Sequence, residues 1–390
     1  MNPFVFNTTP RLVCRPGASS EIGLLAGAAL GKRVLVVTDR GICAHGLERA
    51  TVESLRAAGA AVYVFDGVEA DPSLATLEAA VAHARDSRVT GVVGLGGGSS
   101  LDVAKLAALL AGSGEDIGQA WGVNNASGPR LPLVLVPTTA GTGSEVTPVA
   151  IITVAGDEKR GVSSPVILPD IALLDAELTL SLPAATTAAT GIDAMVHAIE
   201  AYASKSANNN PLSRMFAIDA LKLLGANIAR VVAEPADIEA RSAMLLGSTL
   251  AGMAFANSPV AAVHALAYPI GGSFHIPHGL SNALVLPHVL AFNAAETENG
   301  SAMLYAALAA HVFPDLGDEG GTQATCRAFI ERLGALSVSL GLPARLRDVA
   351  IPEDALAGMA RDAMKQTRLL VNNPRAVEER DALAIYRAAW

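Results

Sequence analysis

At 390 residues the chain is long for a single hydrophobic core, so we expect two domains. The net charge of −9 argues against a nucleic-acid partner and leaves no basic face for a membrane surface. Three widely spaced cysteines without a Cys-x-x-Cys pair argue against a disulfide framework and a thiolate zinc site. Together with the lack of a signal-peptide pattern, they favour a reducing cytoplasm.

The first half of the chain alternates short β-branched runs with helical patterns. Strands are predicted at 34–39, 61–66, 91–95, 133–137 and 169–175, and helices at 47–58 and 71–85. A β-hairpin with a charged tip is predicted at 149–161. Strands that alternate with helices predict a Rossmann-like parallel sheet, so we expect an α/β dinucleotide-binding domain over residues 1–182.

A glycine-rich turn, Gly96-Gly97-Gly98-Ser99, lies directly between a predicted strand and a predicted helix. Glycines let the backbone approach a ligand closely, and a helix start offers free N–H groups and partial positive charge to a pyrophosphate. The turn is not the Gly-x-Gly-x-x-Gly of the usual Rossmann fingerprint. The alternative is a tight strand–helix turn in which a serine is the N-cap.

Asp39 ends the first predicted strand, where a carboxylate can bond a ribose 2′-hydroxyl and repel the 2′-phosphate of NADP. We therefore expect NAD rather than NADP, although Arg40 beside it counts the other way. The alternative role for Asp39 is a helix N-cap. A second polar loop at 138–147 has five hydroxyls and two glycines in ten residues, and it is suited to ribose or phosphate oxygens.

After Leu182 the chain becomes Ala/Leu-rich with a helical period, so we expect an all-helical domain over residues 183–390. Residues 242–295 contain no Asp, Glu, Lys or Arg. Because Asn, Ser, Gly, Pro and His recur through this stretch, we interpret it as the interior of a helical domain around a polar site. A membrane segment is the alternative.

Asp193 and His197 are four residues apart in an apolar stretch, so both side chains lie on one face of a predicted buried helix. A divalent metal would satisfy both groups where each alone is costly to bury. His264 and His278 would complete a set of one oxygen and three nitrogen ligands, which suits Fe(II) or Zn(II) better than Mg(II) or Ca(II). The alternative is a carboxylate bonded to the backbone and histidines satisfied within the core.

Four motifs carry a resemblance to a known family: residues 96–105, 137–147, 189–202 and 277–283. Together they resemble the iron-containing (group III) alcohol dehydrogenases, and most closely the branch of lactaldehyde reductase and 1,3-propanediol dehydrogenase. The similarity covers nearly the whole chain. It implies an active site between the two domains and a homodimer or larger oligomer.

The resemblance also implies roles for individual residues. The implied metal ligands are Asp193, His197, His264 and His278. The implied cofactor contacts are Asp39, Gly97, Gly98, Ser99, Asp102, Thr138, Thr139 and Thr142, with Asp71, Ser144 and Lys159 matching more loosely. In such enzymes the metal lowers the pKa of an alcohol, and the nicotinamide accepts hydride.

The chain departs from the family pattern at one position. Some relatives have a histidine four residues after the third ligand, to which proton relay is credited, and here that position is Tyr268. His275 is close in sequence and is the candidate relay or substrate contact. Water in that role, and a structural role for His275, are the alternatives.

Three other functions compete with an alcohol dehydrogenase. A maleylacetate reductase would use NAD(P)H without firm metal dependence, and a dehydroquinate synthase-like enzyme would use a related loop and zinc. Both act on polyanionic substrates, so the lack of Lys and Arg in residues 242–295 counts against them. A non-enzymatic regulator is the third. We therefore expect a metal-dependent, NAD-linked enzyme acting on short neutral primary alcohols or diols and the corresponding aldehydes.

Overall fold

The computed structural model describes residues 3–154, 158–295, 300–317 and 320–390. The chain forms two compact units, Asn7–Ser181 and Leu182–Trp390, and the segment up to Phe6 belongs with the second unit. The predicted boundary at residue 182 places this segment in the first domain, which differs from the structure. Val5 exchanges backbone hydrogen bonds with the Asn208 side chain, and Phe6 stacks on Phe216 with ring centroids 5.7 Å apart.

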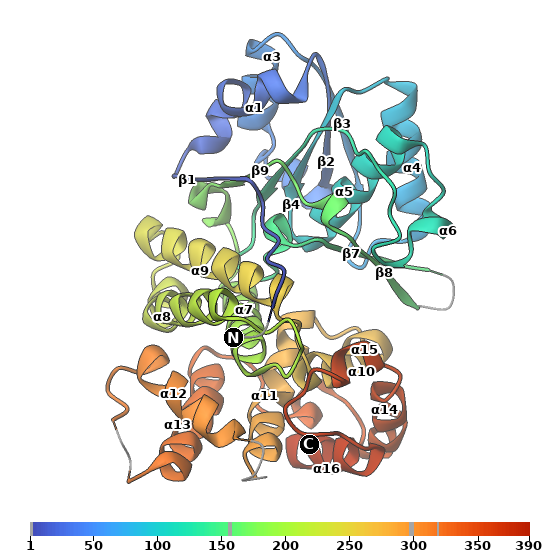
Figure 1. Ribbon diagram of the computed structural model, residues 1–390. Coiled ribbons are helices and arrows are strands. Elements are labelled where there is room, and N and C mark those ends of the chain that lie inside the picture. Colours follow the sequence, from blue (N-terminus) through green and yellow to red (C-terminus); the bar gives the residue numbers. More distant parts are fainter. Residues whose placement is uncertain (1–2, 155–157, 296–299, 318–319) are drawn as a thin grey trace. The chain divides into compact units, whose positions relative to one another are not determined.

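The first unit is built on a six-stranded sheet in the order β1-β9-β6-β4-β2-β3, and every neighbouring pair is parallel (Figure 1). Its strands are β1 (Arg11–Cys14), β2 (Arg33–Asp39), β3 (Ala61–Val68), β4 (Gly91–Gly96), β6 (Leu133–Pro137) and β9 (Ile171–Leu174). The predicted parallel sheet is confirmed. The edge strand β1 was not predicted from the sequence.

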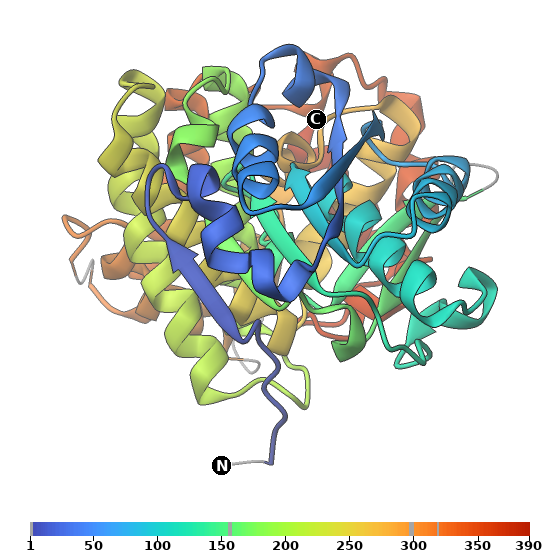
Figure 2. The same cartoon turned by 90° about the horizontal axis from the view of Figure 1, so that it is seen from above.

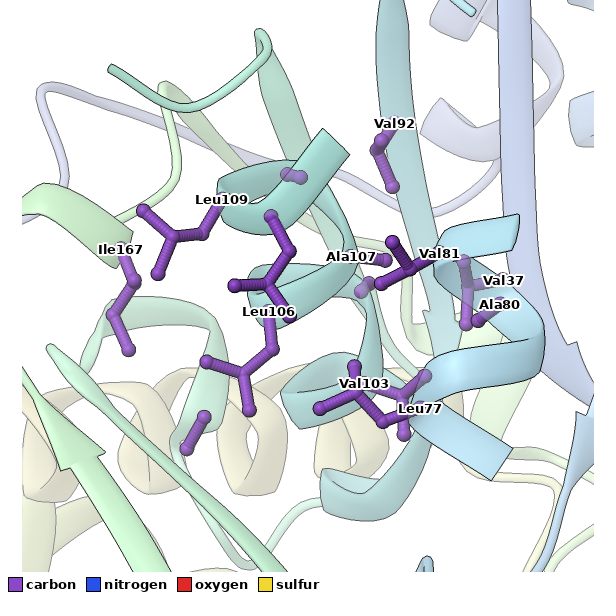
Figure 3. Close-up of a cluster of buried hydrophobic side chains, with 14 of the residues drawn as sticks. Val37, Leu77, Ala80, Val81, Val92, Val103, Leu106, Ala107, Leu109 and Ile167 are labelled. Atoms are coloured by element: carbon purple, nitrogen blue, oxygen red, sulfur yellow. The ribbon is translucent and has the colours of Figure 1, made fainter. Parts of the chain in front are cut away.

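Helices cover both faces of this sheet, because successive residues of a buried strand point to opposite sides. Val34 and Val36 pack with α1 (Ile22–Leu30) and α3 (Arg49–Ala57), which are blue in Figure 2. Leu35 and Val37 face α4 (Leu74–Asp86) and α5 (Gly98–Ser113). Figure 3 shows this second core, in which Leu77 and Val81 of α4 meet Val103 and Ala107 of α5.

The rest of the first unit consists of short elements. The remaining helices are α2 (Arg40–Ala44) and α6 (Ile117–Ala120), with 3-10 turns at Ala18–Glu21, Ser144–Val146, Pro165–Ile167 and Ala176–Thr179. A second sheet has the order β5-β8-β7, from β5 (Gly122–Val123), β7 (Val149–Thr153) and β8 (Lys159–Ser163). Strands β7 and β8 form the predicted antiparallel hairpin, and residues 155–157 of its tip lie outside the described residues.

The described part of the second unit is helical, as predicted (Figure 1). Its helices are α7 (Ala184–Ala203), α8 (Pro211–Ala233), α9 (Ile238–Asn257), α10 (Ala262–Phe274), α11 (His278–Ala294), α12 (Ser301–Val312), α13 (Thr322–Ser339), α14 (Leu356–Ala363), α15 (Thr367–Leu370) and α16 (Glu379–Ala389). Two 3-10 turns lie at Leu346–Val349 and Glu353–Ala355.

The charge-free stretch, residues 242–295, forms most of α9 and all of α10 and α11, and many of its side chains are buried. Among the described residues, no single helix is long and apolar enough to cross a membrane. Helices α9 and α10 pass that test as a pair, by length and composition only, with a bend of 108° between them.

Candidate metal centre and cofactor site

Three helices of the second unit bring three of the predicted metal ligands together. Asp193 lies in the buried middle of α7, His264 near the start of α10, and His278 at the first position of α11. One ligand atom from each lies within 4.8 Å of the others. Asp193 Oδ1 is 3.9 Å from His264 Nε2 and 3.8 Å from His278 Nε2.

Those separations fit a single ion, because two ligands held at about 2.1 Å from a metal lie at most about 4.2 Å apart. Gly279 permits this close approach of α11 to α7. A Cβ at Gly279 would lie 2.3 Å from the Ala189 carbonyl oxygen and 3.2 Å from Asp193 Cβ. The glycine of the Pro-His-Gly motif therefore lets His278 reach the carboxylate.

His197, the fourth predicted ligand, lies on α7 one turn after Asp193. Its ring stacks between Phe255 and His264, with centroid distances of 4.3 Å and 4.6 Å. The three-atom cluster does not include it. The structure thus places His197 against the cluster but brings only the other three ligand atoms within reach of one another.

The carboxylate of Asp193 is held in its charged form. Burial alone would raise the pKa of Asp193, but the three nearby imidazoles and the Asn282 amide lower it below its ordinary value. Asn282 Nδ2 donates to Asp193 Oδ1 at 2.6 Å and lies 3.3 Å from both His264 Nε2 and His278 Nε2. This buried amide orients the oxygen ligand, and sequence analysis did not select it.

Glu200 is a second residue that the sequence analysis missed. It lies on α7, and its buried carboxylate accepts from the backbone N–H groups of Ala261 and Val263 at 3.0 Å and 2.6 Å. It therefore caps α10, which has no side-chain cap of its own. Its Oε2 is also 2.6 Å from His264 Nδ1. Because a carboxylate only accepts, Nδ1 carries a proton, and Nε2 is the ring nitrogen that faces Asp193.

The two predicted catalytic residues have different surroundings. The Tyr268 ring packs edge-on against His278, with centroids 6.2 Å apart, and its hydroxyl accepts from Arg368 at 3.3 Å. His275 is exposed, and it ends α10 in a left-handed conformation with φ 55°. Within the described chain its imidazole makes no hydrogen bond, ion pair or ring contact. Its backbone shapes the turn that leads to His278.

Most of the cofactor residues predicted in the first unit follow the carboxyl ends of β2, β4 and β6, whereas Asp71 and Lys159 do not. Gly97 is the N-cap position of α5, and the helix has no side-chain cap. The alternative of a serine N-cap is therefore wrong. A Cβ at Gly97 would meet nothing nearer than Thr139 at 3.8 Å, an ordinary van der Waals contact, so the turn leaves room for a methyl group there. Gly98 faces Thr142, while Ser99 and Thr139 are half-buried and Thr138 is buried.

Asp39 acts as a helix N-cap, which was the alternative to a ribose contact in the sequence analysis. Its Oδ1 accepts from the Ile42 N–H at 3.0 Å and begins α2. Its Oδ2 is 3.5 Å from Ser100 Oγ, beside the glycine turn. Capping uses one carboxylate oxygen and leaves the other beside the candidate phosphate-binding turn.

Asp102 and Ser144 belong to a buried network around Lys105. Lys105 Nζ donates to Ser144 Oγ and the Val149 carbonyl, both at 2.7 Å, and to Thr147 Oγ1 at 3.2 Å. Asp102 accepts from Ser144 at 2.6 Å and from the Ile151 N–H at 2.9 Å. These bonds tie α5 to the polar loop, so both predicted cofactor contacts already have structural partners.

Asp71 and Lys159, the looser cofactor predictions, form an ion pair with each other. Asp71 is exposed and has a left-handed backbone with φ 54°. The pair joins the start of β8 to the loop before α4. Whether either residue contacts a cofactor remains a prediction.

A parallel sheet of dinucleotide-binding type and a His/Asp cluster on buried helices define a class of protein, the metal-dependent dehydrogenases. Residues 9–176 match the family described as iron-containing alcohol dehydrogenase, and residues 187–390 match the C-terminal part of the Fe-containing alcohol dehydrogenase family. The chain belongs to the iron-containing alcohol dehydrogenase family. The predicted family and enzyme class are confirmed.

Relatives match along nearly the whole chain. It is 41% identical to long-chain-alcohol dehydrogenase 1 of Geobacillus thermodenitrificans, over 92% of this chain and 90% of the relative. A crystal structure of 1,3-propanediol oxidoreductase covers 100% of both chains, with a TM-score of 0.94 and 34% identity. Sulfoacetaldehyde reductase from Bifidobacterium kashiwanohense, in complex with NAD+, has a TM-score of 0.86 and 28% identity, over 99% and 98% of the chains.

Proposed function

We propose that this protein is an NAD-linked, iron-dependent dehydrogenase that interconverts short primary alcohols or diols and the corresponding aldehydes. The observation that carries the proposal is the cluster of Asp193, His264 and His278 with matched ligand spacing. One oxygen and two imidazole nitrogens, with His197 adjacent, suit Fe(II) or Zn(II). When bound, the ion supplies Lewis acidity and the nicotinamide supplies the hydride acceptor.

The residues of the chain would prepare the site for that chemistry. Glu200 fixes the tautomer and ring plane of His264, and Asn282 fixes the carboxylate of Asp193. The side chains of Asp193 and His264 are 3% and 5% exposed, whereas that of His278 is 47% exposed. We infer that substrate and water reach the cluster from the side of His278, and that solvent can take up the alcohol proton.

For the cofactor we propose the turn at Gly97, where α5 begins without a cap, as the pyrophosphate site. Asp39 Oδ2 beside the turn would bond the ribose and favour NAD over NADP. Thr138, Thr139 and Thr142 would contribute hydroxyls. The NAD+ complex of the sulfoacetaldehyde reductase relative supports this cofactor choice.

A maleylacetate reductase-like activity without firm metal dependence stays the second candidate. The metal-ligand spacing of Asp193, His264 and His278 argues against this activity, because a reductase without firm metal dependence does not need such a cluster. We further propose, from the family resemblance, a homodimer or larger oligomer. The three cysteines are unpaired, which is compatible with a cytoplasmic enzyme.

The test is alcohol-dependent reduction of NAD and of NADP by the iron-loaded protein, with propan-1-ol and propane-1,3-diol. We expect turnover with NAD and a loss of more than about 100-fold in His278→Ala. The matched control is His311→Ala, on α12 and outside the cluster, which should keep full activity. Equal activity in both variants would contradict the proposal.

A further inference from the structure

A cation from a segment far along the chain contacts Tyr268, whose ring packs against the candidate ligand His278. Arg368 of α15 donates from Nη2 to the Tyr268 hydroxyl at 3.3 Å. The residue is exposed, and within the described ranges its guanidinium has no carboxylate partner. The expectation of an uncharged pocket rested on residues 242–295 alone, and Arg368 lies outside them.

The position of α15 is fixed by Asn372. The Asn372 side chain donates to the Arg368 carbonyl at 3.0 Å and to the Val260 carbonyl at 3.1 Å. The second contact ties α15 to the segment that leads into α10, the helix of His264 and Tyr268. The backbone of Arg368 is therefore held next to α10.

Tyr268, which Arg368 contacts, packs against the exposed ligand of the cluster. Tyr268 follows His264 by one helical turn, and its ring is 6.2 Å from that of His278, at an interplanar angle of 65°. His278 is also the most exposed ligand, at 47% of its side chain. A substrate that approached the cluster past His278 would pass the Tyr268 ring, whose hydroxyl accepts from Arg368.

The pair presents two kinds of donor to one acceptor. Because the Tyr268 oxygen accepts from the guanidinium, its own hydrogen is left to donate elsewhere. The remaining N–H groups of Arg368 form a planar fork that matches the oxygens of a carboxylate or sulfonate. A neutral alkyl end would gain nothing from either group.

We propose that Arg368 and Tyr268 form an anion subsite, which extends the substrate range to short primary alcohols and aldehydes bearing a carboxylate or sulfonate at the far end. The proposal rests on the alcohol dehydrogenase function proposed above. It makes Arg368 a specificity-determining residue that acts on the end of the substrate away from the reacting carbon.

The test compares propan-1-ol with 3-hydroxypropanoate, which differ only in a terminal methyl or carboxylate. We expect Arg368→Gln to lower kcat/KM for 3-hydroxypropanoate by about 10- to 100-fold, the effect of one charge-assisted hydrogen bond. For propan-1-ol the change should stay below about threefold. Arg327→Gln, an exposed charge removal on α13, is the control and should alter neither substrate.

Equal losses with both substrates would overturn the subsite, and so would wild-type turnover of propan-1-ol without any turnover of 3-hydroxypropanoate. Failure of the iron-loaded wild type with every alcohol would instead count against the proposed function. In that case calorimetry with propanoate still tests the subsite. Binding at least about tenfold weaker in Arg368→Gln supports it, and equal binding overturns it.

Discussion

Glu200 connects the end of one helix to the chemistry of another. Its carboxylate caps α10 and at the same time takes the Nδ1 proton of His264. The consequence is that Nε2 is the nitrogen that faces the cluster, in a ring plane that is set before any ion arrives. Such outer partners raise ligand basicity and commonly contribute 10- to 100-fold in metal affinity.

We therefore expect Glu200→Gln to weaken metal binding by about 10- to 100-fold, because an amide oxygen is a poorer acceptor than a carboxylate. The measurement is competition with a chromogenic chelator, which does not depend on turnover. Glu239→Gln, at an exposed position of α9, is the matched control. Unchanged affinity in Glu200→Gln would show that the contact only caps the helix.

The exposed imidazole of His275 allows a direct test of the proton relay. Asparagine tolerates the left-handed backbone of this position, so His275→Asn removes the ring without forcing the turn. If water takes the proton, kcat should stay within about twofold of the wild-type value. A loss of 100-fold or more, in the range of general acid–base catalysis, would identify His275 as the relay.

At the scale of elements, the start of α5 is the feature on which cofactor binding depends. The helix begins at Gly98 without a side-chain cap, and Gly97 has room around it. A helix start without a side-chain cap has free N–H groups that are suited to an anion. The Lys105 network holds the same helix against the polar loop, so both sides of the candidate site are fixed together.

Gly97→Ala should therefore weaken NAD binding by about 10- to 100-fold while the melting temperature stays unchanged. The added methyl contacts only Thr139, at 3.8 Å, and the backbone φ of −74° suits alanine. Gly27→Ala on α1, where the methyl would lie 3.5 Å from Ala58, is the control in the same unit. Normal NAD affinity in Gly97→Ala would place the pyrophosphate elsewhere.

At the scale of the whole molecule, the sequence predicted those features of the fold and the site that depend on a local residue pattern. The parallel sheet followed from β-branched runs alternating with helices, and the Asp193/His197 pair from a spacing of four residues. The edge strand β1 was missed because its four residues pair with β9, about 160 positions away, and carry no pattern of their own. The attachment of the first residues to the second unit was missed for the same reason.

At the candidate site, too, local patterns were predicted from the sequence and contacts between distant segments were not. Sequence patterns selected the ligands but not Glu200, Asn282 or Arg368, whose roles come from contacts between helices. Asp39 shows a different limit, because one carboxylate oxygen caps α2 while the other stays beside the glycine turn. The cap and the proposed ribose contact are alternatives in the sequence, but the two oxygens of Asp39 allow both in the fold.

Metal-dependent reduction of NAD tests the central claim most directly. The protein is purified without air, stripped with a chelator, and reloaded with Fe(II), Zn(II) or no metal, and NADH absorbance is followed with propane-1,3-diol. We predict no turnover in the stripped protein, recovery with Fe(II), and a loss of more than about 100-fold in reloaded Asp193→Ala. Full activity in the stripped wild type would contradict a metal centre at Asp193, His264 and His278.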